Sequence, residues 1–140
     1  MTIKFLFNEA KITLTERQRL KAFIEDLFVT KRKKLSSLTY IFCSDQFLLG
    51  INRQFLKHDN YTDIITFNLA SPKEEIEGEI YISVDRVRDN ANTLSVSVRE
   101  ELHRVIFHGA LHLCGYKDKR KGEKKRMRMA ENMYLSSYFS

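Results

Sequence analysis

The spacing of apolar and polar residues divides the chain into short alternating stretches and longer helical ones. Alternation, or runs of β-branched and aromatic residues, predicts strands at 3–7, 38–43, 61–69 and 79–83. Apolar residues three and four positions apart predict helices at 15–30, 46–56, 83–94, 97–114 and 122–138. Strands and helices in this mixed order predict one α+β domain over residues 1–140. We expect a small mixed sheet of about four strands, packed by about five helices.

Polar residues at the starts of two helices support their positions. Ser97 with Glu100, and Thr15 with Gln18, have the spacing of capping boxes, in which the two side chains satisfy free backbone N–H groups. From Val105 onward the helix that begins near Ser97 is apolar in nearly every direction, so we expect it to be central and buried on all sides. The last helix is expected to pack inward through Met127, Met133, Tyr134 and Tyr138.

Two histidines interrupt the apolar central helix. His108 and His112 are four residues apart, so their imidazoles project from the same face of the helix. A metal ion is a partner that two such rings can share; without one, the pair would line the core or the surface. His103 lies roughly 140° around the helix from His108, and we expect it on the outer face.

The residues after His112 favour the metal. The frame H-x-x-x-H-x-x-G-x-x-[H/D] is that of a long zinc-protease signature, in which glycine turns the chain so that a third ligand returns to the metal. Here Gly115 would make the turn and Asp118 would be the third ligand. Two imidazoles and a carboxylate predict a catalytic zinc site with an open position. Gly109 occupies the place of the catalytic glutamate of those proteases, which argues against protease chemistry. This glycine either leaves room for a close neighbour or a substrate, or allows tight packing.

Three segments resemble one known family. HGALHLCGYKD is similar to the H-G-x-L-H-L-x-G-Y-D-H signature of the YbeY family of bacterial metal-dependent endoribonucleases. INRQFLKHDNYTDIITFNL resembles that family's L-N-x-x-[FY]-x-x-x-D-x-x-T-D-V-L-S-F segment, and EGEIYIS resembles G-D-I-x-I-S. The matching segments run from Ile51 to Asp118 in the usual order.

The resemblance implies a function and a site. It implies a zinc-dependent endoribonuclease of single-stranded RNA, with one Zn²⁺ or another divalent metal per chain, held by His108, His112 and Asp118. These ligands would serve catalysis through the water that the metal activates. The resemblance also implies maturation of ribosomal RNA at the 3′ end of the small subunit, ribosome quality control, and partners in the small ribosomal subunit or its proteins.

The chain departs from the family pattern at two places. Asp118 stands where the pattern has histidine, which could alter the metal preference. Some members have an arginine where this chain has Leu56; Lys57 or Arg53 would take over its phosphate contact.

Charge and composition agree with an RNA substrate. The net charge is +6, with 24 lysines and arginines against 18 acidic residues, and cations cluster at 31–34 and 117–128. Basic clusters of this kind commonly lie on solvated helix ends or faces. The second cluster, however, adjoins Asp118 and would edge the metal cleft, where it would attract phosphates. We expect Lys119, Arg120, Lys57, Thr62 and Asp63 to contact substrate. Asp63 could instead cap a turn, and His58 could act as a fourth group that shuttles protons.

Nothing in the pattern indicates a membrane or secreted protein. No stretch reaches the length of a membrane span, and the N-terminal residues lack the apolar core of a signal peptide. Cys43 and Cys114 lie in apolar contexts typical of reduced thiols. We therefore expect a cytoplasmic protein. Two alternatives to the nuclease remain open: a ribosome-assembly factor that binds RNA around a structural metal, and a metalloprotease.

Overall fold

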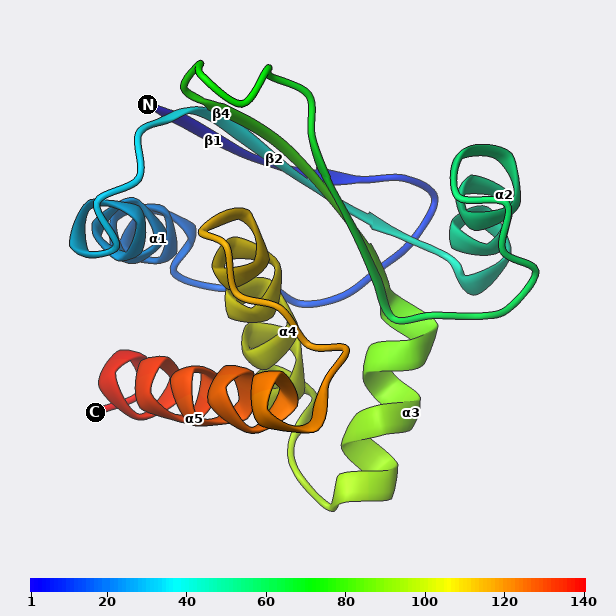
Figure 1. Cartoon of the computed structure of the whole chain (residues 1–140). Coiled ribbons are helices and arrows are strands. Elements are labelled where there is room, and N and C mark those ends of the chain that lie inside the picture. The colour runs from blue at the N-terminus through cyan, green and yellow to red at the C-terminus, as the bar shows by residue number, and fades with distance from the viewer.

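The computed structural model describes all residues, 1–140, and contains four strands and five helices (Figure 1). The predicted α+β domain is confirmed. The strands are β1 (Thr2–Phe7), β2 (Leu35–Cys43), β3 (Ile64–Asn68) and β4 (Ile76–Ser83). The helices are α1 (Arg17–Thr30), α2 (Asp45–Phe55), α3 (Val84–Leu94), α4 (Val98–Leu113) and α5 (Lys121–Tyr138).

The strands form one mixed sheet in the order β1-β2-β4-β3. β1 pairs with β2 and β2 with β4 in parallel, whereas β3 runs antiparallel to β4 and forms an edge of the sheet. Helices α1, α4 and α5 gather on one side of the sheet, and α2 lies beyond the other side (Figure 1). No helix is at once long enough and apolar enough to cross a membrane.

Helix α4 is the centre of the main core. Val105, Ile106, Phe107, Ala110 and Leu111 are buried in one cluster with residues of β1, β2, β4, α1 and α5. This burial confirms the prediction for α4, except along the strip that carries His108 and His112.

Gly109 explains how α4 can lie so close to the sheet. A Cβ atom at this position would lie 2.8 Å from Cδ1 and 3.0 Å from Cγ2 of Ile80, and 3.0 Å from Cδ1 of Ile64. Ile80 is fully buried and has little room to move away. The structure therefore supports the prediction that this glycine leaves room for a close neighbour, here the side chains of Ile80 and Ile64 on β4 and β3.

Three helix details differ from the sequence predictions. Helix α1 begins at Arg17, and Thr15 does not cap it, because Glu16 adopts a left-handed backbone (φ 52°) at the first position and no side chain accepts from the first turn. Met133 does not pack inward: it is 55% exposed, since the buried stripe of α5 runs through Met127, Tyr134 and Tyr138.

His103 is also not on the outer face of α4. Its side chain is only 1% exposed, because the end of α5 covers it: the ring stacks on Tyr138 at 5.2 Å between centroids and meets Phe139 edge-on at 5.0 Å. One ring nitrogen, Nδ1, lies 2.7 Å from the carbonyl oxygen of Arg99, and the other has no partner. Burial lowers the pKa of His103 from its usual value of 6.5.

This buried histidine predicts a loss of stability in mild acid. The unfolded chain protonates His103 at a higher pH than the folded chain does, so the free energy of unfolding falls as the pH drops from 6.5 toward the lowered pKa. In urea unfolding between about pH 7 and about pH 5, we expect His103→Phe to lose stability less steeply than the wild type. His58→Phe, in an exposed loop, should keep the wild-type slope. Equal slopes for His103→Phe and the wild type would contradict this expectation.

Candidate metal centre

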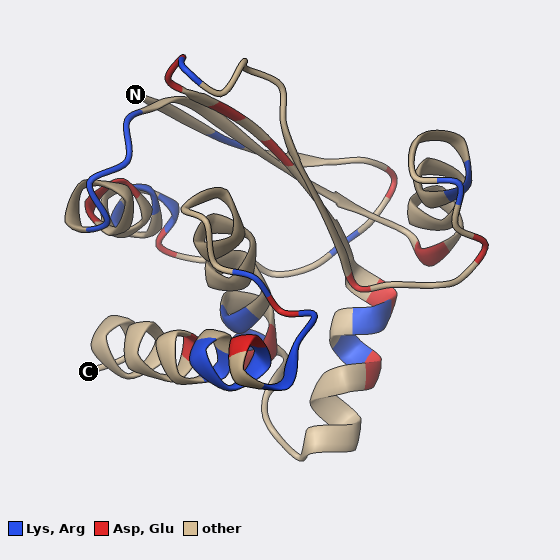
Figure 2. Ribbon diagram, in the orientation of Figure 1, with Lys and Arg blue, Asp and Glu red and all other residues tan.

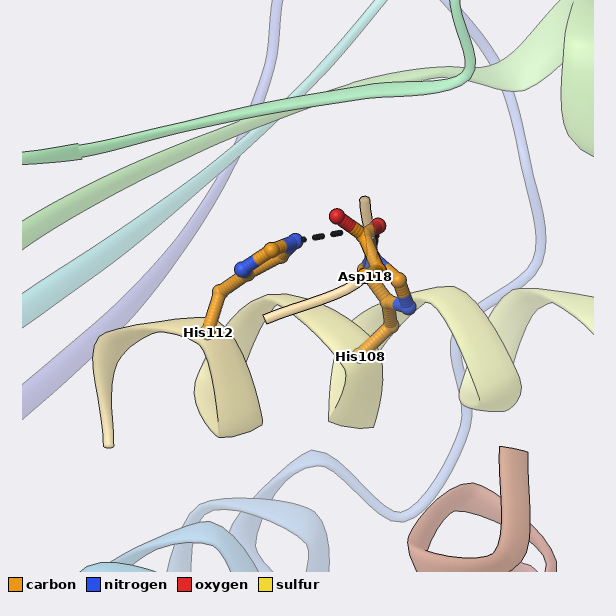
Figure 3. Close-up of side chains that lie close together, drawn as sticks. All are labelled: His108, His112 and Asp118. Atoms are coloured by element: carbon orange, nitrogen blue, oxygen red, sulfur yellow. Dashed lines mark ion pairs between the residues drawn. The ribbon is translucent and has the colours of Figure 1, made fainter. Parts of the chain in front are cut away.

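Helix α4 and the loop after it bring three potential metal ligands together (Figure 3). The Nε2 atoms of His108 and His112 each lie 3.3 Å from Oδ2 of Asp118. One donor atom from each residue lies within 4.8 Å of the others. The His108, His112 and Asp118 side chains are 18%, 28% and 37% exposed, so the group opens toward solvent.

The end of α4 explains how Asp118 reaches the histidines. Gly115 has a φ of +103°, a left-handed conformation that favours glycine, and it reverses the chain. The N–H groups of Gly115 and Tyr116 donate to the carbonyl oxygens of His112 and Leu111, each at 3.0 Å. The chain therefore folds back over the last turn of α4 and carries Asp118 to the face that holds both rings.

Tyr116 anchors this returning loop to α1. The Lys31 ammonium donates to the Tyr116 hydroxyl at 2.6 Å and lies 5.0 Å from the centre of the Tyr116 ring. This hydrogen bond is the main cause of a raised pKa at Lys31. The loop that carries Asp118 is thus held at both sides, by α4 and by the end of α1.

A buried carboxylate supports His108 from behind. Glu131 of α5 is 5% exposed, and its Oε2 lies 2.6 Å from Nδ1 of His108. Its second oxygen, Oε1, accepts from the Arg104 guanidinium at 3.1 Å and lies 3.4 Å from that of Arg128. With Nδ1–H donating to Glu131, the Nε2 atom of His108 is the one turned toward Asp118.

The pKa values of this pair move in opposite directions. Burial tends to lower the pKa of His108, but the hydrogen bond and negative charge of Glu131 outweigh it, so the pKa is raised. Burial tends to raise the pKa of Glu131, but the bond to His108 and the nearby cations lower it overall. The carboxylate of Glu131 is therefore ionised and holds the imidazole of His108 in place.

These donors suit a divalent metal. Imidazole nitrogens and a carboxylate oxygen are ligands that zinc accepts, and metal-binding histidines commonly donate their other ring N–H to a carboxylate. Glu131 fills that second role for His108. The three residues present thus fit the ion that the sequence predicts.

A cleft of about 770 Å³ lies over the three ligands. Residues of α4, of β3 and of the loop that follows α2 line it. Its lining includes several residues that the sequence analysis placed near substrate: Thr62, Asp63, Lys119 and His58. The lining also includes Thr66, whose buried hydroxyl has no partner within the protein.

Two predicted substrate contacts lie outside this cleft. Lys57 is exposed after the end of α2, and Arg120 is the first residue before α5, where its N–H donates to Glu123. Leu56 lines the cleft, while Arg53 forms an ion pair with Asp59. Lys119 is therefore the one lysine or arginine that lines the cleft.

Asp63 faces the metal cleft rather than capping a turn. Its side chain is half-buried, Asn90 of α3 donates to Oδ2 at 3.3 Å, and burial raises its pKa. The charged form of His108 acts on this pKa in the opposite direction. Asp63 thus supplies the cleft with a second carboxyl group besides Asp118.

The sequence analysis missed Glu131. Its signal was present: Glu131 is four residues after Met127 and four before Leu135, on the stripe of α5 that packs inward. A carboxylate at a position of that periodicity is buried against a partner far away in the sequence.

Comparisons with known proteins point to one family. The family model described as "YbeY: Endoribonuclease YbeY" matches residues 4–139. The protein named endoribonuclease YbeY in Cytophaga hutchinsonii is 47% identical over 135 residues, covering 96% of this chain and 94% of its own length. The one in Parabacteroides distasonis is 42% identical over 136 residues, covering 97% and 95%. The solution structure of a Thermotoga maritima protein is similar with a TM-score of 0.62 and 25% identity, over 99% of this chain and 89% of that one.

Proposed function

The chain belongs to the YbeY family of endoribonucleases, and from that premise we propose that it cleaves single-stranded RNA as a zinc-dependent enzyme. As an endoribonuclease it hydrolyses phosphodiester bonds and binds RNA. His108, His112 and Asp118 would hold the ion, in a metallohydrolase domain of 140 residues. One observation carries this proposal: three donors converge in an open cleft, and a buried carboxylate supports one of them.

The residues of the cleft have separate tasks in this reaction. When bound, the ion would supply a Lewis acid that activates water and offsets negative charge on the phosphodiester. Lys119 adds a positive charge at the same cleft. There it would bind a phosphate and stabilise the negative charge that develops on the phosphodiester during cleavage. Thr62 and Asp63, which precede β3, would position the RNA strand in the cleft.

We further propose a role in ribosome maturation. The RNA would be ribosomal, with cleavage at the 3′ end of small-subunit RNA and a part in ribosome quality control. The small subunit or its proteins would be partners, in the cytoplasm. The family resemblance supports this target, and the positive charge of +6 suits a polyanionic partner.

A non-catalytic assembly factor with a structural metal has less support. Structural zinc is usually enclosed by four protein ligands, whereas an open site keeps a position for water or substrate. Only three candidate ligands meet here, and they line a cleft.

The proposal is tested by metal removal and return. We expect the zinc-loaded protein to cleave a single strand that carries the small-subunit 3′ sequence, and to leave the same strand intact when it is annealed to its complement. A chelator should stop cleavage and added zinc should restore it. Cleavage that persists after complete metal removal would contradict the metal assignment. Tight RNA binding without cleavage, with zinc bound, would favour the assembly factor.

A further inference from the structure

Two loops bring four cations to a second hollow beside the metal cleft. Arg32, Lys33 and Lys34 lie in the link between α1 and β2, and Lys73 lies in the loop between β3 and β4. The hollow has a volume of about 400 Å³. Figure 2 shows basic residues on both segments, on the same side of the molecule as the end of α4. We call this the basic hollow.

The backbone fixes the basic hollow. The N–H of Ile76, at the start of β4, donates to the carbonyl oxygen of Lys34 at 2.8 Å and so joins the two loops. The N–H of Lys33 donates to Phe28 of α1 at 2.9 Å, and Arg32 makes the turn with a φ of 58°. The cations therefore project from a folded link that is tied to the sheet and to α1.

The basic hollow continues directly from the metal cleft. Asn68 and Leu113 line both of them, and Leu113 follows the proposed ligand His112 in the sequence. The side chain of Leu113 packs closely on Gly78, since a Cβ atom at Gly78 would come within 2.6 Å of Cδ1 of Leu113. The two hollows thus share part of their lining, and a strand that leaves the metal cleft over Leu113 and Asn68 enters the basic hollow.

The cations of the basic hollow are not neutralised within the protein. None of the four takes part in an ion pair. Two glutamates also line the hollow, but Glu74 is turned back and accepts from the N–H and hydroxyl of Ser71. Glu74 and Glu75 thus bring two negative charges against four positive ones, so the hollow keeps an excess of positive charge.

We propose that the basic hollow is a second phosphate-binding subsite for single-stranded RNA. This inference rests on the proposed function: the linkage to be cut lies in the metal cleft, and the strand continues over Leu113 and Asn68 so that its next phosphates reach Arg32, Lys33, Lys34 and Lys73. Lysines bind phosphates as mobile point charges and carry no base preference. The subsite therefore contributes affinity and register, not sequence selection.

The test compares two double variants that each remove two positive charges. Lys33→Ala with Lys34→Ala alters the basic hollow. Lys4→Ala with Lys11→Ala is the matched control, because both are exposed and line neither hollow. With zinc-loaded protein and a long single strand, we expect the first pair to raise KM with kcat unchanged. The slope of log kcat/KM against log salt concentration should become shallower by about 1.4, since each single-strand phosphate contact contributes about 0.7.

Substrate length separates the subsite from a general effect of charge. A dinucleotide is too short to span both hollows, so both double variants should cleave it like the wild type. Equal kinetics for the two double variants on the long strand would overturn the subsite, as would a loss of kcat without a change in KM. Fluorescence anisotropy of the same strand, carrying a fluorescent label, measures its binding to the protein independently of cleavage. If the wild type binds but does not cleave, the proposed function fails, and the binding difference between the double variants still decides for or against the subsite.

Discussion

Replacing His112 with alanine is expected to remove the metal and, with it, RNA cleavage. His112 supplies one of three proposed donors, and it lies 3.3 Å from the carboxylate of Asp118. Loss of one donor leaves His108 and Asp118 as a pair, which binds a divalent ion weakly. If the ion contributes several kcal/mol to the reaction, cleavage should fall by about 10³-fold or more. Metal content of the purified protein and cleavage of single-stranded RNA, measured on the same samples, check both parts.

His58→Ala is the matched control for this variant. His58 lines the same cleft but lies in the loop after α2, apart from the three-ligand group. It should keep about one metal ion per chain. The ring of His112 is 28% exposed, so its removal should leave the core intact and a melting curve close to that of the metal-free wild type. If His112→Ala retains both metal and cleavage, His112 is not a ligand.

Replacing Glu131 with alanine is expected to weaken metal binding although Glu131 is not a ligand. The carboxylate holds His108 through Nδ1 at 2.6 Å and sets which nitrogen faces the site. Loss of such a supporting partner typically lowers metal affinity about 10- to 100-fold. Glu131→Gln keeps an oxygen that can accept the same hydrogen bond, so it should lie between alanine and the wild type. Competition with a chelator of known affinity measures the zinc affinity of the three proteins and so checks this ranking.

The control for Glu131 must separate positioning from stability. Alanine at this position also removes one of the two buried carboxylates that lie beside Arg104, which destabilises the fold. Glu101 is 4% exposed and lies 3.7 Å from the same guanidinium, but it does not contact His108. Glu101→Gln should therefore lower the melting temperature while zinc affinity stays near that of the wild type. If both variants lose affinity in proportion to their stability, Glu131 has no positioning role.

Local spacing in the sequence predicted the parts of the site that lie on one helix and its end. The spacing of four positions from His108 to His112 places both rings on one face, and a glycine three residues later allows Asp118 to return. Each inference needs the geometry of one helical turn and one reversal, which the sequence specifies within eleven residues. The central burial of α4 followed in the same way from its apolar residues.

Features that depend on packing between distant elements were not predicted. His103 has the spacing of an exposed position relative to His108, yet the end of α5 folds over it. The predicted strand at 61–69 begins at Ile64, because Thr62 and Asp63 turn toward the cleft before pairing with β4 starts. The contact between Glu131 and His108 joins residues 23 positions apart on two helices. None of these follows from propensity or periodicity, since each requires the relative placement of whole elements.

The loop that carries Asp118 is tied to α1 by a hydrogen bond between residues 85 positions apart. The complete donor set therefore exists only in the native chain, because an unfolded chain retains at most the local pair of histidines. An ion that binds the native state alone shifts the folding equilibrium in its favour by mass action, by about 4 kcal/mol at a free concentration 1,000 times its dissociation constant. A divalent ion held at this site would thus stabilise the folded chain as well as take part in the proposed reaction.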